Sequence, residues 1–154
     1  MNTDLIRKEY EDIFEKVVDY NSKIYNLYST AINQDNINNK FSEQCEDVCY
    51  ELIGIYPEYR RKAEDFNNMW EIRSFADEHC SSIEILAKLY EKQDRILDAI
   101  KICIKGTILE NNIDNTFYFG RIGRLIKKYN KINKPKIEFD YDYLKLTDEF
   151  GELI

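Results

Sequence analysis

The sequence predicts an all-α fold, and three observations support that prediction. Only five glycines and two prolines occur in 154 residues, which disfavours collagen-like, turn-dense all-β and low-complexity chains. Hydrophobic residues make up 44% of the chain and charged residues 33%, as in globular proteins. Apolar side chains recur every three or four positions over most of the length, which is the period of an α-helix. We expect about five to six antiparallel helices in one domain, residues 1–135, followed by a short, extended, acidic and aromatic tail at 136–154.

The first half of the chain predicts three helices. Residues 3–32 have helical spacing throughout and form one long helix, or two that break near Asn21. The Asn-rich segment 33–39 predicts a loop, because Asn side chains compete with helical hydrogen bonds. A second helix follows and ends before Pro57, because proline disfavours helical backbone in the residue that precedes it. A third helix then extends from about residue 58 to residue 72.

The second half predicts three more helices. Residues 73–80 break the helical period, and Ser81 with Glu84 forms a capping-box pattern that starts a new helix. This helix has two apolar stripes, so its polar residues form a single strip: Glu84, Lys88, Glu91 and Lys92. The next helix covers 94–109 and is apolar except for a narrow face, while 111–115 is a loop. The last helix, from about residue 119, is apolar on one face and basic on the other.

Seven side chains on two of these helices are large or small in a defined order: Ile83, Leu86, Ala87, Tyr90, Ile96, Ala99 and Cys103. In this order residues 83–103 resemble a tetratricopeptide repeat (TPR), a helix–turn–helix unit of about 34 residues. Gly106 and Asn111 depart from the pattern, and residues 40–59 resemble the second helix of an earlier repeat. The resemblance implies a TPR-like stack whose first helices line a concave protein-binding surface. That surface maps here onto Glu84, Lys88, Glu91 and Lys92.

Charge is distributed unevenly along the chain. Residues 1–80 carry nine basic and 17 acidic side chains, residues 81–135 carry 11 and six, and residues 136–154 carry two and six. Within the basic region, four cations at helical spacing form a stripe that suits phosphates or an acidic protein surface: Arg121, Arg124, Lys128 and Lys131. The net charge of −7 argues against general nucleic-acid binding but leaves this local basic patch open as an alternative.

Few residues suggest catalysis or metal binding. Cys45, Cys49, His79 and Cys80 could be written as a Cys3His zinc site, but buried structural cysteines are the simpler interpretation of helical positions. His79 is the only histidine, and no phosphate-binding glycine loop or paired-histidine motif occurs. We therefore expect no catalytic residue, no cofactor and no metal, and a small metal-dependent enzyme is the third interpretation after the nucleic-acid one.

In the tail, apolar residues alternate with acidic ones from Ile137 to Tyr143, which is the period of a β-strand. A single strand would have no partner for its backbone in a helical protein. The tail could be disordered, could lie along the protein's own basic helix, or could add to a partner's sheet; the second is favoured because its charges complement that helix.

Taken together, the sequence predicts a non-catalytic protein-interaction module, an adaptor or an inhibitor of another protein. The Asn-, Ile-, Lys- and Tyr-rich composition is typical of AT-rich bacterial or phage genomes. We expect a cytoplasmic protein without a membrane partner, because no apolar stretch approaches the ~20 residues that span a bilayer. The identity of the partner and the oligomeric state stay open.

Overall fold

The computed structural model describes residues 3–70, 79–110 and 115–154. These residues form mostly helix, which confirms the coarse fold class, and one small sheet. In order, the elements are α1 (Thr3–Ile32), α2 (Lys40–Trp70), α3 (Ser81–Lys92), α4 (Ile96–Leu109), α5 (Phe119–Ile132), β1 (Ile137–Asp140) and β2 (Lys145–Asp148). The chain divides into two compact units, Met1–Ile85 and Leu86–Ile154.

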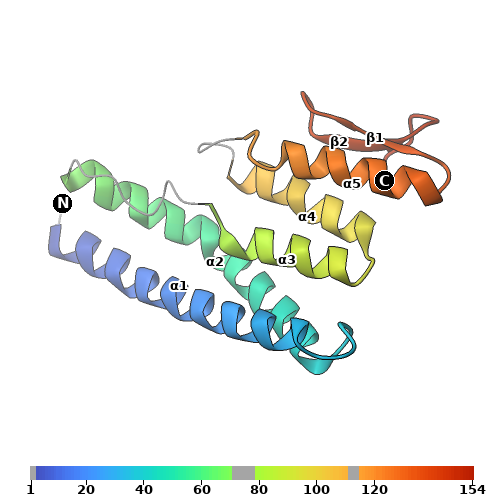
Figure 1. Ribbon diagram of the computed structural model, residues 1–154. Helices are drawn as coiled ribbons and strands as arrows, with labels where there is room; N and C mark the ends of the chain where they lie inside the picture. The colour runs from blue at the N-terminus through green and yellow to red at the C-terminus, as the bar shows by residue number, and fades with distance from the viewer. Residues whose placement is uncertain (1–2, 71–78, 111–114) are drawn as a thin grey trace. The chain divides into compact units, whose positions relative to one another are not determined.

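In the first unit, α1 and α2 lie side by side in opposite directions (Figure 1). Their direction follows from contacts near both ends. Tyr10 stacks on Phe66 with the ring centroids 4.5 Å apart, and the thiol of Cys45 lies 3.9 Å from the backbone oxygen of Ile24. Residues 3–32 form one uninterrupted helix, the first of the two predicted alternatives.

The Asn-rich segment 33–39 is a loop, as predicted, and its last residue caps α2. The side-chain oxygen of Asn39 accepts hydrogen bonds from the backbone N–H groups of Phe41 (2.9 Å) and Ser42 (3.0 Å). Its amide nitrogen donates to the backbone oxygen of Ala31 at 3.1 Å. One asparagine therefore satisfies the first turn of α2 and ties it to the last turn of α1.

The predicted end of a helix before Pro57 is wrong, because α2 continues through this residue to Trp70. A proline inside a helix costs about 3 kcal/mol, since it removes one backbone hydrogen bond and crowds the preceding turn. Tyr56, Tyr59 and Ala63 on both sides of it are at most 3% exposed. Burying these side chains offsets the cost of the proline, so tertiary packing overrides the local signal.

A three-residue turn joins α3 to α4. Asp94 has a φ of 62°, in the left-handed region, and the N–H of Arg95 donates to the backbone oxygen of Tyr90 at 2.8 Å. The N–H of Asp94 donates to the oxygen of Glu91 at 3.1 Å, which completes a Schellman motif. Helix α4 consequently begins at Ile96 and not at residue 94 as predicted.

The tail is not a single extended strand, because β1 and β2 pair as an antiparallel hairpin. Phe139 lies opposite Leu146, and both are buried, as is Ile137. The side chain of Asn130 on α5 donates to the oxygen of Ile137 and accepts from its N–H, both at 2.8 Å. The hairpin thus lies against α5 (Figure 1). The favoured alternative expected contact with this helix, but through an extended segment and its acidic side chains, whereas the backbone of the tail finds a partner within the tail itself.

Some predictions fall on other parts of the chain. The end of the third predicted helix at 71–72, the break at 73–78 and the loop at 111–114 lie outside the described residues. Among the residues that the structure does describe, no helix is both long and apolar enough to cross a membrane.

Candidate functional site

The polar strip predicted on α3 has the expected surroundings. Lys88 and Lys92 are exposed, whereas Glu84 and Glu91 are half-buried. The residues of both apolar stripes are buried: Ile83, Ile85, Leu86, Ala87, Leu89 and Tyr90. The helical period therefore separated core from surface correctly along this helix.

Glu91 of the strip forms ion pairs with two cations of α5. Its carboxylate accepts two hydrogen bonds from the guanidinium of Arg124 on α5, Nη1 to Oε2 and Nη2 to Oε1, each 2.7 Å long. The ammonium group of Lys128 lies 3.5 Å from Oε2. The structure thus brings together one residue of the predicted protein-binding strip and two of the predicted anion-binding stripe.

This contact changes the protonation of Glu91. The hydrogen bonds from Arg124, with the charges of Arg124 and Lys128, lower the pKa of the Glu91 carboxyl from 4.5 to about 2. The same contact raises the pKa of the Arg124 guanidinium. At neutral pH Glu91 is therefore ionised and occupies the position over Arg124 that a phosphate would take.

The other two residues of the basic stripe lie on the same helix. Arg121 is half-buried and Lys131 is exposed, while the apolar residues Ile122 and Leu125 of α5 are fully buried. The sequence thus predicted the amphipathic character of α5. Whether the stripe binds anions stays a prediction.

All four cysteines are buried thiols. The hydrogen bond with Cys45 and burial raise the pKa of the Cys49 thiol well above its ordinary value, so it is neutral and not poised as a nucleophile. Within the described residues, no three His, Cys, Asp or Glu side chains are arranged to hold a metal ion. His79 instead lines a pocket of about 30 Å³ together with Cys80, Tyr56 and Tyr59.

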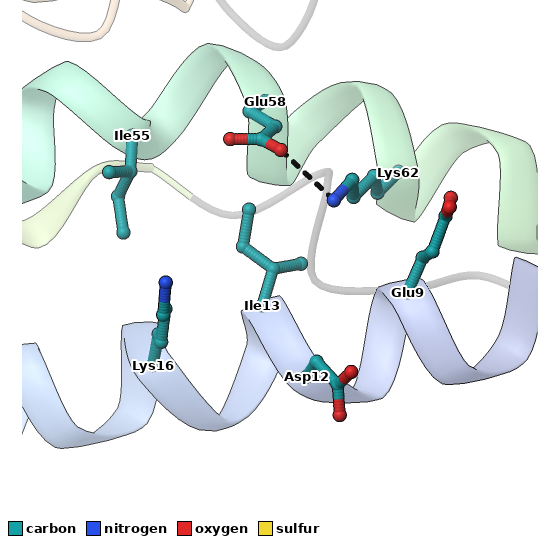
Figure 2. Close-up of a pocket in the computed structure, with 7 residues that line it drawn as sticks. All are labelled: Glu9, Asp12, Ile13, Lys16, Ile55, Glu58 and Lys62. Atoms are coloured by element: carbon teal, nitrogen blue, oxygen red, sulfur yellow. Dashed lines mark ion pairs between the residues drawn. The ribbon is translucent and has the colours of Figure 1, made fainter.

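A larger pocket of about 160 Å³ lies between α1 and α2. Figure 2 shows Glu58 and Lys62 of α2 pointing toward one another, and the two groups are 2.9 Å apart. The hydrogen bond from Lys62 lowers the pKa of Glu58. Glu9, Asp12 and Lys16 of α1 complete a rim of mixed charge around Ile13 and Ile55. Its three carboxylates and two ammonium groups nearly cancel, and Glu58 already has a cationic partner, so this pocket indicates no particular ligand.

The hairpin carries a feature that the sequence interpretation missed. Tyr143 is 75% exposed, Phe150 78% and Leu153 72%. After β2 the chain turns back at Gly151, whose φ is 82°, and Leu153 bridges to Thr147 on the edge of β2 away from β1. The signal in the sequence was the run TDEFGELI, where Asp148 and Gly151 are residue types that favour a tight turn directly after the alternating residues of β2.

The chain matches no family model, no curated protein and no solved structure.

Proposed function

We propose that the chain is a non-catalytic protein-interaction module, an adaptor or inhibitor built as a TPR-like helical stack. One observation supports this function above all others. Among the described residues, every large apolar side chain that is more than 70% exposed lies between positions 132 and 154: Ile132, Tyr143, Phe150 and Leu153. Clusters of exposed apolar side chains mark interaction sites, because their contact with water is unfavourable and a bound partner excludes that water.

The TPR-like architecture has support from α3 and α4. They contain 12 and 14 residues and are joined by a short turn, as in a helix–turn–helix repeat. Ala87 and Ala99, the small residues that this repeat uses where its helices approach each other, are both 0% exposed. The predicted strip on α3 is then a second contact region, with Lys88 and Lys92 as its exposed members.

Nucleic-acid binding through α5 is the competing function. Two of the four cations of the predicted basic stripe, Arg124 and Lys128, already lie against the Glu91 carboxylate. A phosphate would have to displace that carboxylate and approach a chain of net charge −7. The electrostatics therefore favour a protein partner.

The test is affinity capture with the full chain from its native host, followed by mass spectrometry and reconstitution with the purified candidate. We expect a protein that co-elutes with the chain in a defined ratio after nuclease treatment. Recovery of nucleic acid alone, or of no reproducible protein, would reject the proposed function. A variant with Lys88→Glu and Lys92→Glu then tests whether α3 takes part in the complex.

A further inference from the structure

The hairpin has two different faces, and the strand register assigns residues to each. Leu146 is buried, so its neighbour Thr147 points to the opposite side of the sheet. Residues directly opposite in antiparallel pairs share a face, and Thr147 pairs with Glu138 on one side and with Leu153 on the other. Glu138, Thr147 and Leu153 therefore form a row on the face away from the buried side chains.

The turns at the two ends of the hairpin carry two further exposed side chains, both aromatic. Tyr143 lies in the turn between β1 and β2, and Phe150 lies in the turn that follows β2. The side-chain oxygen of Asp140 accepts from the N–H of Tyr143 at 3.0 Å, and that of Asp148 accepts from the N–H of Phe150 at 2.8 Å. These hydrogen bonds hold both turns in shape. We use the name hairpin surface for the exposed residues of this face, of the two turns and of the segment that returns after Gly151: Glu138, Asp142, Tyr143, Phe150, Glu152 and Leu153.

The apolar members of the hairpin surface contribute little to folding. Ile137, Phe139 and Leu146 already form the buried side of the hairpin, each at most 8% exposed. Phe139 also makes an edge contact with Phe119 of α5, with the centroids 6.1 Å apart. Tyr143, Phe150 and Leu153 lie outside this contact and keep most of their area in water. Burying these side chains against a partner would therefore contribute favourable free energy to binding.

The charges around these side chains decide which partner fits. Residues 136–154 contain six carboxylates and two lysines, a net charge of −4. Glu138, Asp142 and Glu152 are exposed. One of the lysines, Lys145, is opposite Asp140 in the register and lies over the Tyr143 ring at 5.8 Å. An apolar surface with surplus carboxylates repels nucleic acid, anionic membranes and acidic peptides, and attracts cationic segments that also carry apolar side chains.

We propose that the hairpin surface binds a cationic protein segment in which Lys or Arg residues alternate with large apolar ones. This inference rests on the proposed function and specifies the partner's chemistry. Tyr143, Phe150 and Leu153 contact the apolar side chains of the segment, and the three carboxylates contact its cations. Aromatic side chains supply large contact area at low entropic cost, which suits them to act as the anchors of such a complex.

The test selects binders to the full chain from a displayed library of random 16-residue peptides. We expect recovered peptides to be enriched in Lys, Arg and large apolar residues, and their affinity to fall as salt rises from 50 to 200 mM. Synthetic copies are then measured by fluorescence anisotropy against two variants. One combines Tyr143→Ser with Phe150→Ser, and the other combines Glu138→Lys, Asp142→Lys and Glu152→Lys. Each should weaken binding about tenfold or more.

Matched controls lie on α1, where the same chemical changes leave the hairpin intact. Tyr25→Ser removes an aromatic side chain that is 54% exposed, and Glu11→Lys with Glu15→Lys reverses two exposed charges. Both controls should bind as the unmodified chain does. Circular dichroism of all variants checks that the helices are retained.

Three results would overturn the inference: recovered peptides without positive charge, affinity indifferent to the hairpin variants, or recovery of no binder. The second result, with affinity lost on Lys88→Glu and Lys92→Glu, moves the interface to α3 and leaves the proposed function standing. Affinity capture of the natural partner decides the proposed function independently of all three.

Discussion

Glu91 forms a contact that links two sites which the sequence predicts separately. From the sequence, Glu91 belonged to a protein-binding strip and Arg124 to an anion-binding stripe on another helix, and the two residues are 33 positions apart in the chain. The bidentate contact between them joins the two candidate sites into one structural feature. Residue type and spacing along a helix cannot reveal such a contact, because it depends on where the two helices lie.

We expect Glu91→Gln to lower the free energy of unfolding by about 1–2 kcal/mol at pH 7, because it removes a charge-assisted contact that is partly shielded from water. The folded-state pKa of Glu91, about 2, is below its ordinary value of 4.5. The contribution is therefore complete above the unfolded pKa and is lost as pH falls toward the folded pKa.

Urea unfolding of both proteins measures this difference, which should shrink by about half between pH 7 and pH 3. Glu152→Gln changes an exposed carboxylate in the same unit and serves as the control. A difference between Glu91→Gln and the unmodified chain that is independent of pH would contradict the assignment of this ion pair.

At the scale of elements, α2 is helical against its local sequence. Pro57 is exposed and lies within the helix, three residues after Gly54, whose added Cβ would meet nothing within 4 Å. Both residues weaken helix formation, yet the buried side chains around them keep the element continuous. Replacing each of these two residues with alanine measures how much free energy the packing must offset.

Pro57→Ala should raise the free energy of unfolding by about 1–3 kcal/mol, because it restores a backbone donor and relieves crowding of the preceding turn. Gly54→Ala is the reference, with an expected gain of about 0.5–1 kcal/mol from reduced freedom of the unfolded chain. Urea midpoints rank the two variants. A loss of stability in Pro57→Ala would show that the proline is needed for the course of α2.

The contact made by α4 is tested by Ala99→Glu. Ala99 is 0% exposed, so the new carboxylate would be forced into a packed interior without a prepared partner. We expect a loss of about 3 kcal/mol or more, seen as a lower melting temperature in circular dichroism. Lys101→Glu introduces the same group at an exposed position of this helix and should change stability by no more than about 0.5 kcal/mol. Equal effects of the two changes would place Ala99 outside the core.

At the scale of the whole molecule, charge separates the candidate partners. The chain has a net charge of −7, and in the sequence its basic region follows an acidic first half and precedes an acidic hairpin. Arg124 and Lys128 are engaged by Glu91 within the second unit. The long-range field therefore opposes polyanions, although cations are abundant on α5.

We expect random single-stranded DNA to bind no more tightly than about 10⁻⁴ M at physiological salt, the weak limit of non-specific binding. Fluorescence anisotropy with a labelled oligonucleotide measures this affinity. The reference protein reverses Arg121, Arg124, Lys128 and Lys131 to Glu. Tight binding that weakens steeply with salt and disappears in that reference would make nucleic acid the partner and reject the proposed function.

The sequence by itself determined the helical class, the loop at 33–39, the start of α3 at Ser81 and the buried faces of α3, α4 and α5. These features depend on periodicity and on local backbone chemistry, which any stretch of about a dozen residues carries within itself. The TPR-like register also comes from the sequence and stays a prediction.

Only the tertiary structure decided the continuity of α2 through Pro57, the pairing of β1 with β2, and the contact of Glu91 with Arg124. Each depends on free energy gained between residues distant in the chain: burial against α1, backbone hydrogen bonds across a hairpin, and opposite charges on separate helices. The exposure of Tyr143, Phe150 and Leu153 belongs to the same group. Whether an apolar side chain stays exposed depends on which other residues pack in the core. The candidate interface therefore follows from the tertiary structure.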